Sequence, residues 1–351
     1  MSWLVSVLLA HPASAADVTD MAPGLGLLGT LRYAGSAQDG DLVEAGEVVA
    51  GRNVQRHDLD VALEFAPAPG FALTLDLALT PSLRYTYADS STMIVEPEDG
   101  SGSYLPGEPV GAPVEISAGG LTGFWIGAAL APFSETYAKG QQSTWRIDAA
   151  IRTPSASRNL WTAVDGKRGT APGGLGLKLA GAFSVDRGVG NPWLQAVFVD
   201  EGRATVKVVD ETGTVWAEEL AIKPASTLTT RFGVAINGWK DEDLGAAFDV
   251  DLYLGGQYRT WEDVASGVYL PNVLDGARSI PVTTGDNLAG IAGLALDAAL
   301  NDYVQIRAGS EFTYRTPYTL EHVYDVQTSG DTWQIGWFFQ VQGMGSFKNE
   351  E

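Results

Sequence analysis

The chain has 351 residues, and its 43 Asp and Glu outnumber its 22 Lys and Arg, so the formal net charge is −21. A chain this acidic, without a basic patch, is not expected to bind nucleic acid. It has no cysteine, which excludes disulfides and thiol nucleophiles. Its hydrophobic content of 45% excludes a disordered chain.

The first fifteen residues are typical of a secretory signal peptide. The apolar run Trp3–Ala10 is too short to span a bilayer, Pro12 ends it, and Ala13-Ser14-Ala15 has the small-x-small pattern of a cleavage site. We therefore predict a cleaved signal over 1–15 and one domain over 16–351. A short buried helix at the N-terminus is the alternative interpretation.

The rest of the chain alternates apolar and polar residues with period two. In 302–315, for example, Ile306 and Phe312 fall on one face and Arg307 and Glu311 on the other. No stretch approaches 18 apolar residues, so helical membrane spans are excluded, and a closed β-barrel is the other way to cross a bilayer. The alternation predicts about twelve strands, in chain order 24–35, 55–66, 71–88, 118–132, 143–154, 174–187, 192–200, 226–239, 245–260, 286–299, 302–316 and 332–347. Glycine-rich 24–29 and 173–181 belong to strands and not to phosphate loops, since neither opens a helix.

The connections between these strands alternate in length. Short ones fall at 67–70, 133–142, 188–191, 240–244 and 300–301, and long ones at 36–54, 89–117, 155–173, 201–225, 261–285 and 317–331. This is the arrangement of outer-membrane barrels. We predict an all-β fold, a single transmembrane antiparallel barrel of roughly ten to fourteen strands. Its short turns and both termini would be periplasmic and its long loops extracellular. A secreted β-sandwich or jelly roll is the alternative, because half-buried sandwich strands alternate in the same way.

The alternation of side chains along each predicted strand assigns the charged residues to the face that lines the lumen. It assigns the aromatic residues to the lipid interfaces. The predicted lumen-facing charges are Arg32, Asp58, Asp60, Glu64, Asp76, Arg84, Arg146, Asp148, Arg152, Lys178, Arg231, Asp249, Asp251, Arg259, Arg307 and Glu311. The predicted aromatic belt lies near the short turns at Phe65, Phe71, Trp145, Trp193, Trp239 and Tyr303, and near the long loops at Tyr33, Tyr85, Tyr258, Tyr314 and Trp333.

With its amphipathic hairpins, its aromatic belts and the terminal strand TWQIGWFFQVQGMGSF, the sequence resembles bacterial outer-membrane β-barrel proteins as a broad class over 24–347. The resemblance implies export to the outer membrane of a Gram-negative bacterium, with contacts to lipid and lipopolysaccharide. It also implies that Phe347 is the terminal aromatic residue read by the barrel-assembly machinery. Two features depart from the usual pattern: four residues follow Phe347, and Gly343 and Gly345 occupy positions where larger apolar residues are common.

The charged lumen favours a porin-like passive channel for small hydrophilic solutes, because facing charges of opposite sign can select such solutes. If the same charges plug the lumen, the alternative is a structural or adhesion barrel whose acidic outer loops bind a partner or divalent-bridged lipopolysaccharide. An outer-membrane hydrolase would need a base such as His57, or His322 beside Glu321 and Asp325, at the lumen rim. We expect no enzyme activity, catalytic residue, metal or cofactor.

Overall fold

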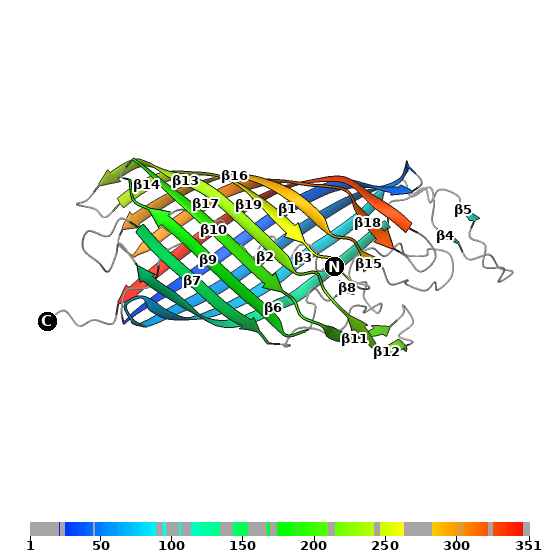
Figure 1. Ribbon diagram of the computed structural model, residues 1–351, viewed down its shortest axis with the longest axis horizontal. Helices are drawn as coiled ribbons and strands as arrows, with labels where there is room; N and C mark the ends of the chain where they lie inside the picture. Colours follow the sequence, from blue (N-terminus) through cyan, green and yellow to red (C-terminus); the bar gives the residue numbers. More distant parts are fainter. Residues whose placement is uncertain are drawn as a thin grey trace.

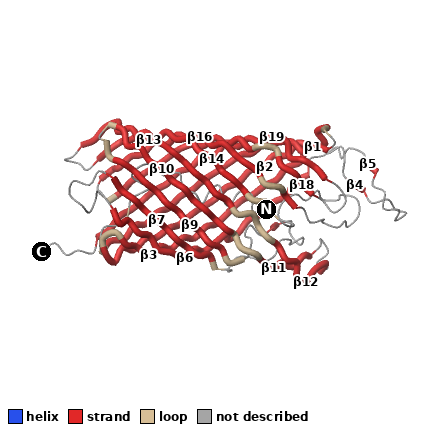
Figure 2. The backbone as a smooth tube through the Cα atoms, viewed as in Figure 1, coloured by secondary structure: helices blue, strands red, loops and turns tan. Residues whose placement is uncertain are grey.

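The computed structural model describes residues 21, 25–44, 46–88, 94–95, 105–106, 114–133, 143–153, 167–168, 174–187, 189–209, 215–241, 246–262, 283–301, 303–321 and 326–346. Within these ranges every regular element is a β-strand (Figure 2). None of the described residues forms a helix that is long and apolar enough to span a bilayer.

Twelve antiparallel strands close into one barrel among the described residues (Figure 1). Consecutive barrel strands pair with each other, and β1 pairs with β19 from Gly26 opposite Ser346 to Val43 opposite Thr328, which leaves no open edge. The predicted fold is therefore confirmed. The barrel strands are β1 (Gly26–Glu44), β2 (Glu47–Ala68), β3 (Phe71–Ala88), β6 (Val114–Phe133), β7 (Ser143–Arg152), β9 (Gly176–Val185), β10 (Gly190–Asp200), β13 (Thr227–Asp241), β14 (Ala246–Arg259), β16 (Asn287–Asn301), β17 (Val304–Arg315) and β19 (Val326–Ser346).

The two ends of the barrel differ in their connections. At the short-turn end, β2 passes to β3 through Pro69 and Gly70, and Gly70 has the positive φ of 76° that a tight turn requires. The longer connections lie at the opposite, long-loop end. They contain the small strands β4 (Ile94–Val95), β5 (Leu105–Pro106), β8 (Lys167–Arg168), β11 (Ala204–Val209), β12 (Val215–Ile222), β15 (Thr283–Thr284) and β18 (Tyr318–Glu321).

The connection predicted as a long loop over 36–54 is mostly strand, and that prediction was wrong. β1 continues to Glu44 and β2 begins at Glu47, with Glu44 opposite Glu47. The polar residues of this segment suggested a loop. They are strand residues because β1 is paired on both sides, with β2 and with β19, so its hydrogen bonds continue past the apolar part of the barrel.

The outer surface is apolar and the interior holds the polar side chains, the reverse of a soluble sandwich. On β14, Leu252 and Leu254 are 48% and 66% exposed, whereas the alternate residues Asp251 and Tyr253 are buried. Leucines, isoleucines and aromatic residues occupy the outer positions of the other barrel strands in the same way. Large apolar side chains are stable in such positions when lipid, and not water, surrounds them.

Candidate functional site in the barrel lumen

The lumen gathers most of the charged residues that the sequence assigns to it. On the inner face lie Arg32, Asp58, Asp60, Glu64, Asp76, Arg146, Asp148, Arg152, Lys178, Arg231, Asp249, Asp251, Arg259, Arg307 and Glu311, each buried or partly buried. Period-two alternation identified this face because an antiparallel barrel sends successive side chains to opposite sides.

Arg84 is the exception among the predicted lumen charges. It pairs with Gln55, both side chains are exposed, and the neighbouring Leu83 is buried instead. The register between β3 and β6 shifts between Thr80 and Leu83. Such an irregularity inverts the inside-outside phase of the residues beyond it, which a strict alternation cannot anticipate.

Trp193 was predicted in the outer aromatic belt, and it lies in the lumen instead. Its side chain is 1% exposed, and its indole Nε1 donates a hydrogen bond of 2.8 Å to Asp251. The outer position beside it is taken by Leu194. Both faces of β10 are largely apolar, so the sequence alone does not fix which face is inner.

Three inward aromatic side chains each lie opposite a glycine on an adjacent strand. Trp193 pairs with Gly233, Tyr253 with Gly293 and Phe338 with Gly309. A Cβ atom at Gly233 would stand 2.5 Å from the Trp193 ring, so the ring covers the glycine. The aromatic rings therefore line the barrel wall, in space that a side chain at the glycine would otherwise occupy.

Charged side chains lie over two of these rings and join strands that are two or three places apart along the barrel wall. Arg307 donates to Asp251 at 2.7 Å, and Arg231 donates to Glu311 at 2.9 Å. The guanidinium of Arg307 also lies 5.7 Å from the centre of the Phe338 ring. We call this side of the lumen, comprising Trp193, Arg231, Asp251, Tyr253, Arg307 and Phe338, the packed wall.

The opposite side of the lumen carries ion pairs that are less buried. Arg146 donates to Glu64 at 2.8 Å and to Asp148 at 2.7 Å, while Lys178 stands 3.9 Å from Asp76. The side chains of Arg146, Lys178 and Asp148 are 13%, 17% and 25% exposed. We call this side, comprising Glu64, Asp76, Arg146, Asp148 and Lys178, the open wall.

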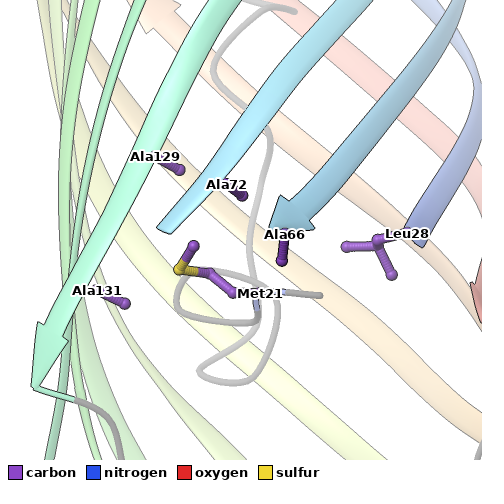
Figure 3. Packing of buried hydrophobic residues seen from close by; sticks show 6 residues of the cluster. All are labelled: Met21, Leu28, Ala66, Ala72, Ala129 and Ala131. Atoms are coloured by element: carbon purple, nitrogen blue, oxygen red, sulfur yellow. The ribbon is translucent and has the colours of Figure 1, made fainter. Parts of the chain in front are cut away.

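An apolar cluster lies inside the barrel at the short-turn end. Met21, which precedes β1, packs inside the barrel against Ala66, Ala72, Ala129 and Ala131, together with Leu28 (Figure 3). The alanines are small, so the thioether side chain fits between the strands.

The aromatic residues predicted at the interfaces, apart from Trp193, lie outside the barrel where they are described. Exposed outer positions hold Tyr33, Phe65, Trp145, Trp239, Tyr258, Tyr303, Tyr314 and Trp333, and Phe71 is partly buried there. The side chain of Tyr85 and the whole of Phe347 fall outside the described residues, as do His322, the signal segment 1–15 and most of the acidic loops.

His57 does not face the lumen, so it is not placed to act on a solute there. A hydrogen bond of 2.9 Å joins its Nδ1 to the Tyr33 hydroxyl, and its ring lies beside Tyr33 and Trp337 on the outer face. No group of three or more His, Cys, Asp or Glu suited to a metal ion occurs within the described ranges.

Several lumen residues were not predicted from the sequence. The inward aromatics Trp125, Tyr253 and Phe338 were missed because an aromatic residue was expected to face lipid. Arg52, Glu201, Glu262 and Arg315 were missed because they lie in or beside segments interpreted as loops or strand ends. The continued alternation beyond 35 and before 55 is the signal that could have revealed Arg52. We also did not predict Arg56 and Asp297 as lumen charges, although both lie in predicted strands.

A closed barrel with an apolar exterior and a charged interior is the architecture of proteins that cross the outer membrane with strands. The chain is a β-barrel of the outer-membrane class.

Solved barrels of the same class resemble this one in overall architecture. An outer membrane channel from Pseudomonas putida F1 is 10% identical, with 92% of this chain and 98% of that chain covered and a TM-score of 0.47. A Pseudomonas aeruginosa FadL homologue is 11% identical, with 92% and 90% covered and a TM-score of 0.40. The β-domain of the Bordetella autotransporter BrkA is 9% identical, with 88% and 98% covered and a TM-score of 0.38. No protein-family model and no curated relative matches the chain.

Proposed function

We propose that this barrel is a narrow, porin-like passive channel of the bacterial outer membrane for small hydrophilic solutes. The observation that carries the proposal is the open wall, where ion pairs join β7 to β2 and β9 to β3 while the side chains of Arg146, Asp148 and Lys178 stay partly exposed inside the lumen. Charges of both signs on such a wall would give a transverse field that orients polar solutes. Outer-membrane lipid and the assembly machinery are the partners that this role requires.

The burial of the packed wall limits the width of any path. Trp193, Asp251 and Arg307 are at most 1% exposed, so polar and aromatic side chains fill that side of the lumen. A solute would therefore follow the open wall, past the pair of Lys178 and Asp76, whose 3.9 Å separation makes it the loosest of the ion pairs given above. We expect low unitary conductance for this reason.

The same packing favours a second candidate, a structural or adhesion barrel that acts through its outer loops. A lumen whose ion pairs stay closed would conduct nothing and would serve to hold the strands together. In that case binding of a partner or of divalent-bridged lipopolysaccharide would depend on the long-loop end.

Planar-bilayer recording of the refolded protein tests the proposal. Heat-modifiable mobility on a gel first establishes that the barrel has folded. Step conductance above the protein-free bilayer is the expected result, and a shift of ion selectivity in Lys178→Glu would assign it to the open wall. A folded barrel that gives neither conductance nor solute flux into liposomes contradicts the channel and leaves the structural role.

A further inference from the structure

Four strands bring a cluster of hydrogen-bond donors together inside the long-loop end of the lumen. Arg259 on β14 stands opposite Thr227 on β13 and opposite Asn287 on β16. Arg315, the last residue of β17, donates through Nη1 to Asn287 Oδ1 and through Nη2 to Gln257 Oε1 at 2.9 Å. Asn287 therefore lies between the two arginines.

Within the described residues, Arg315 is a buried positive charge of this cluster that donates hydrogen bonds to neutral groups. Arg315 is 5% exposed, and the hydrogen-bond acceptors given for its side chain are two neutral amide oxygens, with no carboxylate paired to it among the described residues. The charges of Arg259 and Arg52 also act on it. Glu262 accepts a hydrogen bond from Arg259 and so compensates the charge of that arginine. A buried guanidinium beside like charges is unfavourable unless an anion accompanies it.

The same cluster contains buried donors for which the described residues offer no acceptor. Asn287 Oδ1 must face Arg315, because a guanidinium can only donate, so the free end of the amide is the Nδ2 donor. Among the described residues, Asn287 Nδ2 and the hydroxyls of Thr227 and Thr284 have no hydrogen-bond partner. Buried polar groups are almost always hydrogen-bonded, so these donors favour a ligand that accepts hydrogen bonds.

We propose that this cluster binds a small oxyanion, the carboxylate or phosphate group of a solute in the lumen. The guanidinium of Arg315 offers the planar donors that such groups accept, and Asn287 adds a neutral donor beside it. The site faces the lumen, whereas Tyr258, Leu288 and Tyr314 of the same strands face outward, so a lipid phosphate is not the expected source. The inference deepens the proposed channel function by naming the chemical class of its solute, and it rests on that proposed function.

Thermal unfolding of the full chain, refolded in detergent without lipopolysaccharide, tests the site without requiring conductance. The probe is inorganic phosphate, against sodium chloride at equal ionic strength, and the readout is the temperature at which the folded gel band disappears. We expect phosphate to raise that temperature beyond chloride. Arg315→Gln should weaken the apparent affinity roughly tenfold, since it removes a charge-assisted hydrogen bond. Arg84→Gln, which removes the same charge from an exposed position in the β2–β3 hairpin, should respond like the wild type.

Asn287→Asp keeps the proposal falsifiable if Arg315→Gln fails to fold. It places a fixed carboxylate between Arg259 and Arg315, so the variant should unfold at a higher temperature than the wild type without phosphate and should lose the phosphate response. An Asn287→Asp barrel that is less stable and still responds to phosphate overturns the site. So does a wild type that responds only when lipopolysaccharide is present, or not at all.

Conductance separates this inference from the proposed function. A phosphate response without any conductance supports the binding site and contradicts the channel. Conductance without a phosphate response supports the channel and overturns the oxyanion site.

Discussion

The packed wall and the open wall line the same lumen and are built from the same kinds of charged residue, but their surroundings differ. On the packed wall, aromatic rings opposite glycines bring Arg231 and Arg307 against apolar surface, so both guanidinium side chains are only 1% exposed and Asp251, the partner of Arg307, is fully buried. On the open wall, the residues beside Lys178 are Ala150 and Val199, and Arg146 and Lys178 stay partly exposed. The neighbours of an ion pair therefore decide how far water reaches it and how much its loss would cost in stability.

Removing the central carboxylate of the packed wall should have the largest effect on the stability of the barrel. Asp251→Ala removes the acceptor of both Arg307 and the Trp193 indole, which leaves a buried charge and a buried donor without that partner. We expect a loss of about 3–5 kcal/mol in the free energy of unfolding, measured by urea titration of the refolded barrel in lipid vesicles. Asp251→Asn keeps an acceptor for the indole and should lose less. An unchanged midpoint for Asp251→Ala would show that these pairs do not hold the wall.

Adding a side chain at a glycine beneath one of the inward aromatic rings should have the next largest effect on stability. Gly233→Ala would place a methyl group 2.5 Å from the Trp193 ring, so the ring must move from the wall into the lumen. We expect a loss of about 1–3 kcal/mol in the same titration, the usual effect of overpacking. Gly290→Ala is the control, because no atom lies within 4 Å of its added Cβ. Equal effects of the two substitutions would contradict the role of the ring.

The open wall should show the smallest effect on stability and a clear one on selectivity. Lys178→Glu replaces a loose 3.9 Å ion pair with two carboxylates, at side chains that are 17% and 12% exposed, so we expect a loss of about 1 kcal/mol in the free energy of unfolding. The reversal potential under a salt gradient should move toward cation selectivity. Lys240→Glu, an equal charge change at an exposed position near the short turns, should leave the reversal potential unchanged. A shift of the same size in both variants would place the selectivity outside the open wall.

The sequence by itself determined the architecture, because alternation along a strand is a local property. The phase of Arg307 and Glu311 against Ile306 and Phe312 predicts one polar and one apolar face, and the strand count and short turns follow from repeating that pattern. All twelve predicted strands are present, although the first two are longer than their apolar parts suggest.

The tertiary structure alone decided which residues meet inside the barrel. Trp193 faces inward because Gly233 on the adjacent strand leaves room for its ring and Asp251 accepts its indole proton, and neither condition is visible along β10. Arg84 faces outward because a register shift between strands inverts its phase. Likewise, Arg315 reaches Asn287 only because the register of β16 and β17 brings the ends of these two strands together. Register and cross-lumen contact depend on residues far apart in the chain, and a period-two pattern does not contain that information.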